Sequence, residues 1–360
     1  MSMLILGIET SCDETAAAVI NASDHGIEVV SNVVSSQVKL HAEWGGVVPN
    51  LAAREHLKNI LPVISSSLQE ANIVPEQLDL MAVTSGPGLI PALLIGTTAA
   101  KTLAYLWKKP LIGIHHIEAH IYANLISGNS DSKEELKFPV LALVVSGGHT
   151  QLILMKEHLR YEIVGQTLDD AVGEAFDKVA RILDLGYPGG PIVSKYADSF
   201  KTDAESKEWL GMRFPRPMFD SKNFDFSFSG LKTAVLYAVK SNPQILSSET
   251  LKKEACFQFQ EAVIDTLIHK TLGTVEKYGV KTVMLAGGVS ANSELRARLG
   301  TAIKNRFPNI GYIIPNISYS GDNAAMIAAA AYYRWNSLED KEALEESWKT
   351  LDADANMSLS

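Results

Sequence analysis

Residues 140–155 read Val-Leu-Ala-Leu-Val-Val-Ser-Gly-Gly-His-Thr-Gln-Leu-Ile-Leu-Met, which is an apolar run, a polar glycine turn and a second apolar run. This pattern predicts two buried strands joined by a tight hairpin, with Arg160 to Val164 as a third strand. A helix is expected next, because apolar residues recur at helical spacing on one face: Val172, Phe176, Val179, Ala180 and Leu183. Without a Cβ, Gly147 and Gly148 can adopt positive φ and let backbone N–H groups approach an anion.

The same order of elements occurs earlier in the chain. Leu4 to Leu6, Thr15 to Ile20 and Gly26 to Val34 predict three strands, followed by an amphipathic helix that contains Leu57 to Leu68. The two halves share no obvious sequence identity, yet their elements are duplicated in order. We therefore expect an α/β protein with two similar lobes around a central cleft.

The boundaries of the lobes are predicted from polar segments that lack helical or strand periodicity. Residues 1–127 form the first lobe, completed by a helix at 320–336, and residues 138–319 form the second. The polar, aperiodic residues 128–137 are the expected linker. Residues 337–360 are expected to be a polar, solvated C-terminal tail.

Composition narrows the class of protein. The 360 residues are 46% hydrophobic and carry a formal net charge of −9, which fits an α/β enzyme and argues against nucleic-acid binding over a broad face. The start lacks the basic region and apolar core of a signal peptide, so we expect a cytoplasmic protein. Cys12 and Cys256 form neither a disulfide framework nor a Cys-x-x-Cys pair.

One basic segment could still contact RNA locally. It contains Arg213, Arg216, Lys222 and Lys232, interleaved with five phenylalanines between Phe214 and Phe228. Basic and aromatic side chains together suit phosphates and bases. The alternative is a surface loop that its aromatic side chains hold in place, with the charges solvated.

His116 and His120 are the strongest metal-ligand candidates. At about 100° per residue, they lie about 40° apart around a helix, so both imidazoles can reach one ion. Glu118 falls on the opposite side, and the order is not His-Glu-x-x-His, which argues against zinc-protease chemistry. Asp322, in the turn before an alanine-rich helix, could complete a site of two histidines and one carboxylate, or could simply cap that helix together with Ser320.

Two further glycine turns stand where ligands could bind. Val283 to Ala286 predicts a buried strand, Gly287-Gly288 the turn, and Ser290 or Asn292 the cap of the next helix. Gly186-Tyr-Pro-Gly-Gly-Pro191 is too rich in proline for a strand. It is either a binding loop or a corner between helices.

Eight motifs in order resemble the TsaD family, the bacterial tRNA threonylcarbamoyladenosine transferases. They extend from the first strand to about Tyr333: Gly7-Ile-Glu-Thr-Ser-Cys-Asp-Glu-Thr15, His116-x-Glu-x-His120, Val145-Ser-Gly-Gly-His-Thr150, Gly173-Glu-Ala-Phe-Asp-Lys178, Tyr187-Pro-Gly-Gly-Pro191, Phe226-Ser-Phe-Ser-Gly-Leu-Lys-Thr233, Ala286-Gly-Gly-Val-Ser-Ala-Asn292 and Asp322-Asn323. The resemblance implies the actin-like fold of sugar kinases and Hsp70. It also implies transfer of a threonylcarbamoyl group from threonylcarbamoyl-AMP to the N6 amine of the adenosine beside the anticodon, in tRNAs that read codons starting with A.

The resemblance also implies roles for individual residues. His116, His120 and Asp322 would hold one divalent metal, with Fe²⁺ expected and Zn²⁺ as the alternative. The adenylate would be bound by Val144, Val145, Ser146, Gly147, Gly148, Asp177, Gly190 and Asn292. Many relatives carry an acidic residue where this chain has Ser194, and we expect the hydroxyl to retain binding with altered contacts. No general base is assigned among Glu9, Asp13, Glu14 and His149.

The implied partners are tRNA, a paralogous actin-like subunit (TsaB), a small P-loop ATPase (TsaE) and the enzyme that makes threonylcarbamoyl-AMP. Three alternatives remain. An actin-like small-molecule kinase or ATPase would need Mg-ATP and a carboxylate base rather than two histidines. A glycoprotein metallopeptidase would be expected to carry a His-Glu-x-x-His motif, which this chain lacks. A nucleotide-binding scaffold would have no use for His116 and His120.

Overall fold

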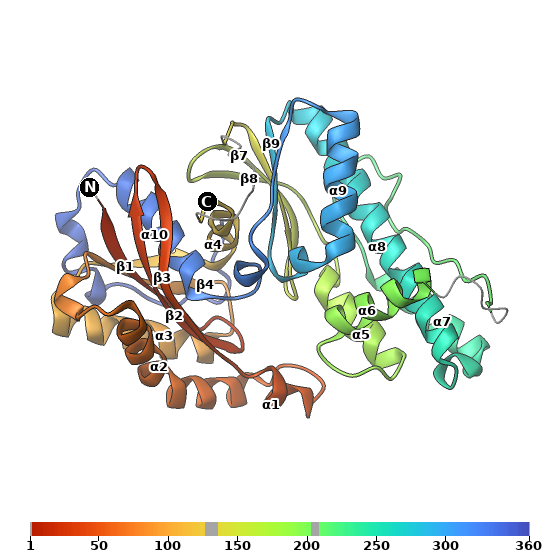
Figure 1. The fold of residues 1–360 in the computed structure, drawn as a ribbon, viewed down its shortest axis with the longest axis horizontal. Coiled ribbons are helices and arrows are strands. Elements are labelled where there is room, and N and C mark those ends of the chain that lie inside the picture. The colour runs from red at the N-terminus through yellow and green to blue at the C-terminus, as the bar shows by residue number, and fades with distance from the viewer. Residues whose placement is uncertain (1, 127–135, 203–208, 360) are drawn as a thin grey trace. The chain divides into compact units, whose positions relative to one another are not determined.

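The computed structural model describes residues 2–126, 136–202 and 209–359. The chain divides into two compact units, each with one five-stranded sheet (Figure 1). Unit 1 contains Met1–Lys133, His158–Arg160 and Ile314–Ser360, and unit 2 contains Glu134–Glu157 and Tyr161–Ile313. Most of the expected linker at 128–137 lies outside the described residues.

The sheet of unit 1 has the strand order β3-β2-β1-β4-β5. Its first three strands form an antiparallel meander: β1 (Met3–Glu9), β2 (Glu14–Ser23) and β3 (Gly26–Ser36). The strand β4 (Leu80–Gly86) then pairs in parallel with β1, and β5 (Leu111–His115) pairs in parallel with β4. The strands β1 and β4 are almost wholly buried, as expected for parallel strands that helices cover on both faces.

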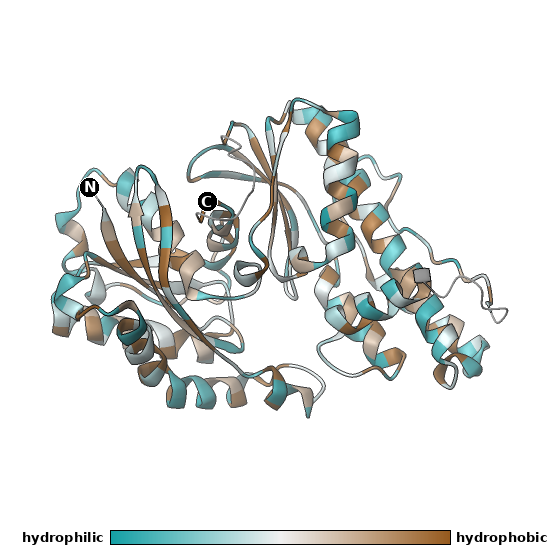
Figure 2. Cartoon of the chain, viewed as in Figure 1, coloured by the Kyte–Doolittle hydropathy of each residue, from teal (hydrophilic) through white to brown (hydrophobic). Residues whose placement is uncertain are grey.

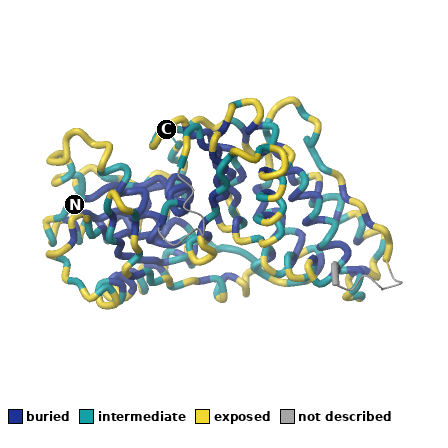
Figure 3. The backbone as a smooth tube through the Cα atoms, turned by 45° about the horizontal axis from the view of Figure 1, so that its top comes forward, coloured by how far each residue is buried: buried dark blue, intermediate teal, exposed yellow. Residues whose placement is uncertain are grey.

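Helices of unit 1 cover both faces of this sheet. The helices α2 (Pro49–Ala71) and α3 (Ile90–Trp107) pack on the face that presents Leu6 and Ile8, with Ile60 and Ala100 in the shared core. The helix α10 (Ala324–Ser337) packs on the other face, against Gly7. Two short helices complete the unit, α1 (Val38–Ala42) and α4 (His116–Tyr122). Figure 2 shows brown, apolar stretches along the inner strands, and Figure 3 shows dark blue, buried backbone in the interior, as a buried apolar core requires.

Unit 2 repeats this arrangement strand for strand, with the order β10-β9-β6-β7-β8. The hairpin of residues 140–155 is confirmed: β6 (Val140–Val145) pairs antiparallel with β7 (Thr150–Glu157), and β8 (Arg160–Gln166) follows. The strands β9 (Thr282–Ala286) and β10 (Gly311–Ile313) extend the other side in parallel. The duplicated order of strands confirms the predicted fold class. The helices are α5 (Val172–Ile182), α6 (Gly189–Thr202), α7 (Ser229–Ser241), α8 (Glu249–Tyr278) and α9 (Ser293–Arg306).

The segment after α10 differs from its expected behaviour, because it packs against unit 1 instead of being solvated throughout. Trp348 and Leu351 contact the core between the sheet and α3. Lys101 Nζ donates a hydrogen bond to the carbonyl of Leu351 (2.8 Å), and the backbone N–H of Asp354 donates to the carbonyl of Ser85 (2.8 Å). Sequence polarity alone did not indicate these contacts, because the few apolar residues of the segment are spaced irregularly.

Among the described residues, no helix combines the length and apolar character needed to cross a membrane.

Candidate metal centre and ligand pocket

His116, His120 and Asp322 meet in unit 1, although the carboxylate lies far from the histidines in the sequence. Both histidines lie on α4 and are buried, and Asp322 lies just before α10, which packs beside α4. One Asp322 oxygen, Oδ1, is 3.5 Å from His116 Nε2 and 3.2 Å from His120 Nε2. The helical spacing of the two histidines therefore brings them together as the sequence predicted.

The three side chains fit a divalent metal. Ligands at about 2.1 Å from a tetrahedral or octahedral ion are separated by about 3.0 to 3.4 Å, and the two measured distances, 3.5 and 3.2 Å, lie near that range. Within the described part of the chain, Nδ1 of the buried His120 makes no hydrogen bond, and Nε2 faces Asp322 Oδ1 at 3.2 Å. A metal bound between Nε2 and this oxygen would satisfy both atoms.

The surroundings shift the pKa values of the two histidines in opposite directions. Burial opposes protonation of His116, but the carboxylates of Asp322 and Glu9 outweigh it and raise the pKa of His116 to about 9. Burial lowers the pKa of His120. In the absence of a metal, a proton on His116 therefore balances the carboxylates, and a cation that binds here must displace it.

Glu118 points away from this cluster, as predicted. Its side chain is completely buried and accepts hydrogen bonds from Arg334 Nε (2.6 Å) and Nη2 (2.8 Å), on α10. A carboxylate held in this way is a structural brace between α4 and α10. It cannot serve as the base that a zinc protease places beside its metal.

Asp13 and Glu14, which the sequence left open as candidate bases, form an acidic turn in the same unit. Burial, followed by the charges of Asp322 and Asp13, raises the pKa of Glu14 to about 9. Glu14 also accepts a hydrogen bond from the Ser36 hydroxyl (2.9 Å), across the β2–β3 pair. This geometry does not single out either carboxylate as a base.

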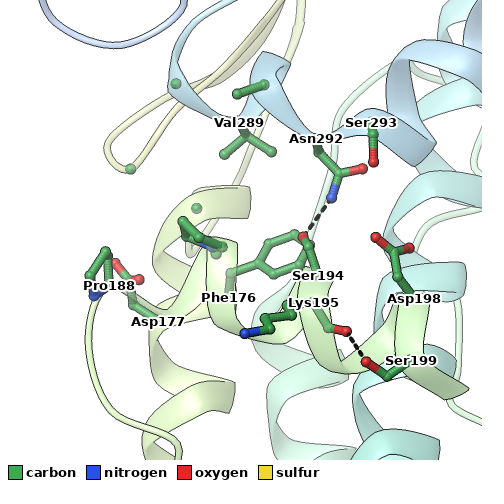
Figure 4. A pocket seen from close by; sticks show the side chains of 16 residues that line it. Phe176, Asp177, Pro188, Ser194, Lys195, Asp198, Ser199, Val289, Asn292 and Ser293 are labelled. Atoms are coloured by element: carbon green, nitrogen blue, oxygen red, sulfur yellow. Dashed lines mark hydrogen bonds between the residues drawn. The ribbon is translucent and has the colours of Figure 1, made fainter. Parts of the chain in front are cut away.

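Unit 2 contains a separate cavity of about 710 Å³ (Figure 4). Four of the eight residues expected to bind the adenylate line it: Gly147, Asp177, Gly190 and Asn292. Val144 and Val145 are instead fully buried in β6, and neither Ser146 nor Gly148 lines the cavity. The remaining lining includes Phe176, which the sequence placed on the apolar face of its helix, and Lys195 and Asp198, which it did not single out. Lys195 and Asp198 lie on α6, where no motif marked them.

The glycines in and near this cavity differ in conformation from the expectation. Gly147 and Gly148 do not have positive φ, whereas Gly287 does (85°), and a Cβ on Gly287 would lie 2.5 Å from the carbonyl oxygen of Val145. A Cβ on Gly147, Gly148 or Gly190 would meet no atom within 4 Å. These three glycines are therefore not needed for internal packing, and they leave backbone open to a ligand.

Asn292 organises one wall of the cavity. Its Oδ1 accepts the backbone N–H of Leu295 (2.8 Å), which makes it the N-cap of α9 and settles the choice between Ser290 and Asn292. Its Nδ2 donates to Ser194 Oγ (2.8 Å), a bond drawn in Figure 4, and to Gln260 Oε1 (2.9 Å). Asp177 is likewise engaged, because its Oδ1 accepts the N–H of Gly189 (2.7 Å) at the start of α6. Gln260 lies inside the long helix α8, where no motif marked it.

Only part of the basic aromatic segment is open to a ligand. Phe214, Phe226 and Phe228 are buried. Arg216 pairs with Asp265 (2.6 Å) and Lys232 with Asp170 (3.1 Å). Arg213 and Lys222 are exposed, so they are the members of the cluster that remain accessible.

The structure also decides whether Asp322 caps α10 or can act as a ligand. The N-cap of α10 is Asn323, whose side chain accepts the N–H of Met326 (3.1 Å). Asp322 is thus not needed as the cap, and its carboxylate faces the two histidines.

Comparison with known proteins identifies the family. The model of the TsaD family, tRNA N6-adenosine threonylcarbamoyltransferase, matches residues 28–329. Relatives with that name from Listeria innocua and Bacillus cereus are 50% and 48% identical to this chain over 327 residues, which is 91% of this chain and 90% of each relative.

Solved structures support the fold independently. The crystal structure of T. kodakarensis HypF matches 96% of this chain with a TM-score of 0.59 at 14% identity, and HypF in a phosphate- and nucleotide-bound form matches 94% with a TM-score of 0.55 at 13% identity. This chain spans about half the length of those two chains, 49% and 47%. The similarity establishes a shared actin-like fold. Since the family match includes both histidines, the glycine turns and Asp322, this chain belongs to the TsaD family of tRNA N6-adenosine threonylcarbamoyltransferases.

Proposed function

We propose that this chain transfers the threonylcarbamoyl group from threonylcarbamoyl-AMP to the N6 amine of the adenosine beside the anticodon, in tRNAs that read codons starting with A. Relatives with this activity in their names are up to 50% identical over nine-tenths of the chain. Within the molecule, the cluster of the buried His116 and His120 with the partly exposed Asp322 carries the proposal. A small-molecule kinase of the same fold has no use for such a cluster.

A divalent metal would be held by His116 Nε2, His120 Nε2 and an oxygen of Asp322. Two imidazoles with one carboxylate suit Fe²⁺ or Zn²⁺ and leave positions open for substrate. We propose Fe²⁺ as the resident ion, with Zn²⁺ as the alternative. When bound, the metal supplies Lewis-acid polarisation of the carbamoyl carbonyl.

The adenylate would occupy the cavity of unit 2, whose volume of about 710 Å³ is in the range of nucleotide-sized ligand sites. The open glycines support this assignment: Gly147 lies at the hairpin turn, close to the start of α5, where Gly173 N–H donates to the carbonyl of Ser146 (3.1 Å). The backbone amides of Gly147 and Gly148 would bind the phosphate, since the N–H of Ser146 donates to the carbonyl of His149 (2.8 Å). Ser194, whose oxygen accepts from Asn292, keeps its own hydroxyl hydrogen for a ribose oxygen.

The reaction needs little covalent participation by the protein. The mixed anhydride is already activated, so the N6 nitrogen attacks the carbonyl carbon, the bond from that carbon to the phosphate oxygen breaks, and AMP leaves with its charge on phosphate. The residues of this chain bind the adenylate, fix its orientation and hold the phosphate as charge develops. The group that accepts the proton from N6 is not assigned.

tRNA is the proposed acceptor. Because tRNA is a cytoplasmic substrate, this function supports a cytoplasmic location. The net charge of −9 makes extensive phosphate binding by this chain alone unfavourable. We therefore propose that partners complete the RNA-binding surface, with TsaB-type and TsaE-type proteins as the candidates.

The test is transfer itself. The purified chain, with candidate partners, is given unmodified tRNA and threonylcarbamoyl-AMP, and the modified nucleoside is quantified beside ATP and peptide hydrolysis. His120→Ala should lose the metal and more than about 100-fold of the transfer rate while it remains folded, because one of three ligands is gone. The exposed His25→Gln is the matched control. Wild-type transfer by His120→Ala would reject the metal site, and ATP or peptide turnover without transfer would reject the function.

A further inference from the structure

Glu9 lies at the end of β1, beside the metal cluster, and its side chain is completely buried. Three donors converge on its carboxylate. Oε1 accepts the backbone N–H of Ser11, and Oε2 accepts the hydroxyl of Thr84 from the neighbouring strand β4. Oε2 is also 3.3 Å from Nδ1 of His116. A buried carboxylate with this set of partners is held in place by a turn, a neighbouring strand and a helix.

His116 is therefore held from both sides of its ring. Nδ1 faces Glu9, while Nε2 faces Asp322 Oδ1 at 3.5 Å. An ionised carboxylate can only accept hydrogen bonds, so the nitrogen that faces Glu9 must carry a proton. The opposite nitrogen then presents its lone pair to the metal position.

We propose that Glu9 is a positioning residue, which fixes the tautomer and orientation of His116 so that Nε2 is the ligating atom. The inference rests on the proposed metal site. It assigns to Glu9 a role different from that of the general base, for which the sequence had left it as a candidate. A carboxylate that orients a ligating histidine in this way typically changes metal affinity by about 10- to 100-fold.

Ser11 cannot fulfil this role. Its hydroxyl also lies near His116 Nδ1, at 3.2 Å. A hydroxyl can donate or accept, so it is compatible with either tautomer. Of the two neighbours of Nδ1, Glu9 alone dictates where the proton sits.

The substitution Glu9→Gln separates this role from simple packing, because the new amide has only one orientation that satisfies its surroundings. The N–H of Ser11 is a backbone donor that cannot rotate, so the amide oxygen must replace Oε1. The amide NH₂ then faces Thr84 and His116. The hydroxyl of Thr84 can rotate to accept, whereas His116 can accept at Nδ1 only by moving its proton to Nε2, which blocks the metal position.

The experiment titrates metal-free protein with Zn²⁺ and, for its visible spectrum, with Co²⁺. Glu9→Gln should bind both ions about 10- to 100-fold more weakly, and the Co²⁺ absorption should change shape because the ligand set changes. Thr84→Val is the matched control: it removes a neighbouring donor to the same oxygen but leaves Ser11 and His116 in place. We expect less than a threefold change in its Zn²⁺ affinity.

A nitrogen-15 NMR spectrum of Zn²⁺-loaded wild-type protein, labelled at histidine, tests the same proposal without a substitution. His116 should show a metal-bound Nε2 and a slowly exchanging proton on Nδ1. A metal-bound Nδ1, or a rapidly exchanging proton there, would overturn the proposal even if Glu9→Gln failed to fold.

The outcomes also separate this inference from the function on which it rests. Wild-type affinity and an unchanged Co²⁺ spectrum in folded Glu9→Gln would reject the positioning role and leave the metal site intact. Failure of wild-type protein to bind either ion would reject the site, and the inference with it.

Discussion

The ion pair between Glu118 and Arg334 is expected to stabilise unit 1. Glu118 is fully buried, and the two hydrogen bonds from Arg334 offset the cost of burying its carboxylate. We expect Arg334→Met to reduce the free energy of unfolding by about 3 kcal/mol, because it leaves a buried carboxylate without its partner. Urea titration of wild-type and variant protein measures this difference.

An exposed ion pair provides the control for that measurement. Arg306 and Glu276 form a salt bridge in which both side chains are at least half exposed. Arg306→Met should therefore cost less than about 1 kcal/mol. Equal effects of the two substitutions would show that Glu118 is not held as the structure indicates.

His56 makes stability depend on pH. It is completely buried on α2, where its Nδ1 is 2.8 Å from the Thr15 hydroxyl and its Nε2 donates to the carbonyl of Cys12 (3.0 Å). Burial lowers its pKa below the ordinary value of 6.5. Because the folded-state pKa is below the unfolded one, neutral His56 stabilises the protein fully above about pH 6.5, and this contribution is lost as the pH falls through the folded-state pKa.

Urea unfolding at pH 8 and at pH 5.5 tests this prediction. His56→Gln should destabilise the protein more at pH 8 than at pH 5.5, because the contribution of neutral His56 is present in wild-type protein only at the higher pH. The raised pKa values of His116 and Glu14 change the stability of wild type and variant alike, so they cancel in this difference. The exposed His25→Gln serves as the control. Equal destabilisation by His56→Gln at the two pH values would contradict the prediction.

At the level of single residues, the sequence predicted the relative positions of side chains that lie on the same helix. The spacing of His116 and His120 within one helix was enough to place both imidazoles together and to exclude Glu118. The link from Asp322 to those histidines could not follow from spacing, because it depends on how α10 packs on the sheet. Reasoning from residue types left Asp322 as either a ligand or a cap, and the family resemblance assigned it to the metal site. Glu9 was noticed as a carboxylate, but its contact with His116 arises only because β1 pairs with β4 and β4 pairs with β5, the strand that precedes α4.

At the level of elements, α10 connects packing to the metal centre. It lies on β1 so closely that a Cβ on Gly7 would be 2.2 Å from the carbonyl oxygen of Ala324 and 2.9 Å from the backbone nitrogen of Ala328. We expect Gly7→Ala to displace the start of α10 and destabilise the protein by about 1 to 3 kcal/mol. Asp322 immediately precedes this helix, so Zn²⁺ affinity should fall with stability.

The control is Gly230→Ala on α7, where the nearest atom to a new Cβ is 3.5 Å away. It should be neutral or stabilise by up to about 1 kcal/mol, since alanine restricts the unfolded chain. Denaturant unfolding and Zn²⁺ titration are measured for both variants. Unchanged Zn²⁺ affinity in a destabilised Gly7→Ala protein would mean that α10 does not set the position of Asp322.

Elements with strong periodicity were predictable, and those defined by contacts were not. The hairpin of β6 and β7 follows from two apolar runs and a glycine turn, and the meander of unit 1 from a similar pattern. The conformation of the turn was less accessible: positive φ belongs to Gly287, which must pass the carbonyl of Val145, and not to Gly147 or Gly148. The docking of Leu351 after α10 had no periodic signal at all.

At the scale of the whole molecule, charge conflicts with an RNA substrate. The chain has a net charge of −9, and two cations of its basic segment, Arg216 and Lys232, are already paired with carboxylates. Exposed Arg213 and Lys222 remain available. We therefore expect the isolated chain to bind tRNA weakly, with a shallow dependence on salt.

The double variant Arg213→Ala/Lys222→Ala tests whether this segment binds RNA. Removing one cation that neutralises a phosphate should flatten the slope of log affinity against log salt by roughly 0.7 to 0.9, so the double variant should flatten it by up to about 1.4 to 1.8. Arg216→Ala is the internal control: it should lower stability through Asp265 and leave the slope unchanged, because its charge is already neutralised. Affinity is measured by titration of tRNA at several salt concentrations. A wild-type slope in the double variant would place the RNA path elsewhere on this chain or on its partners, whereas a reduced slope for Arg216→Ala would mean that RNA competes with Asp265 for this arginine.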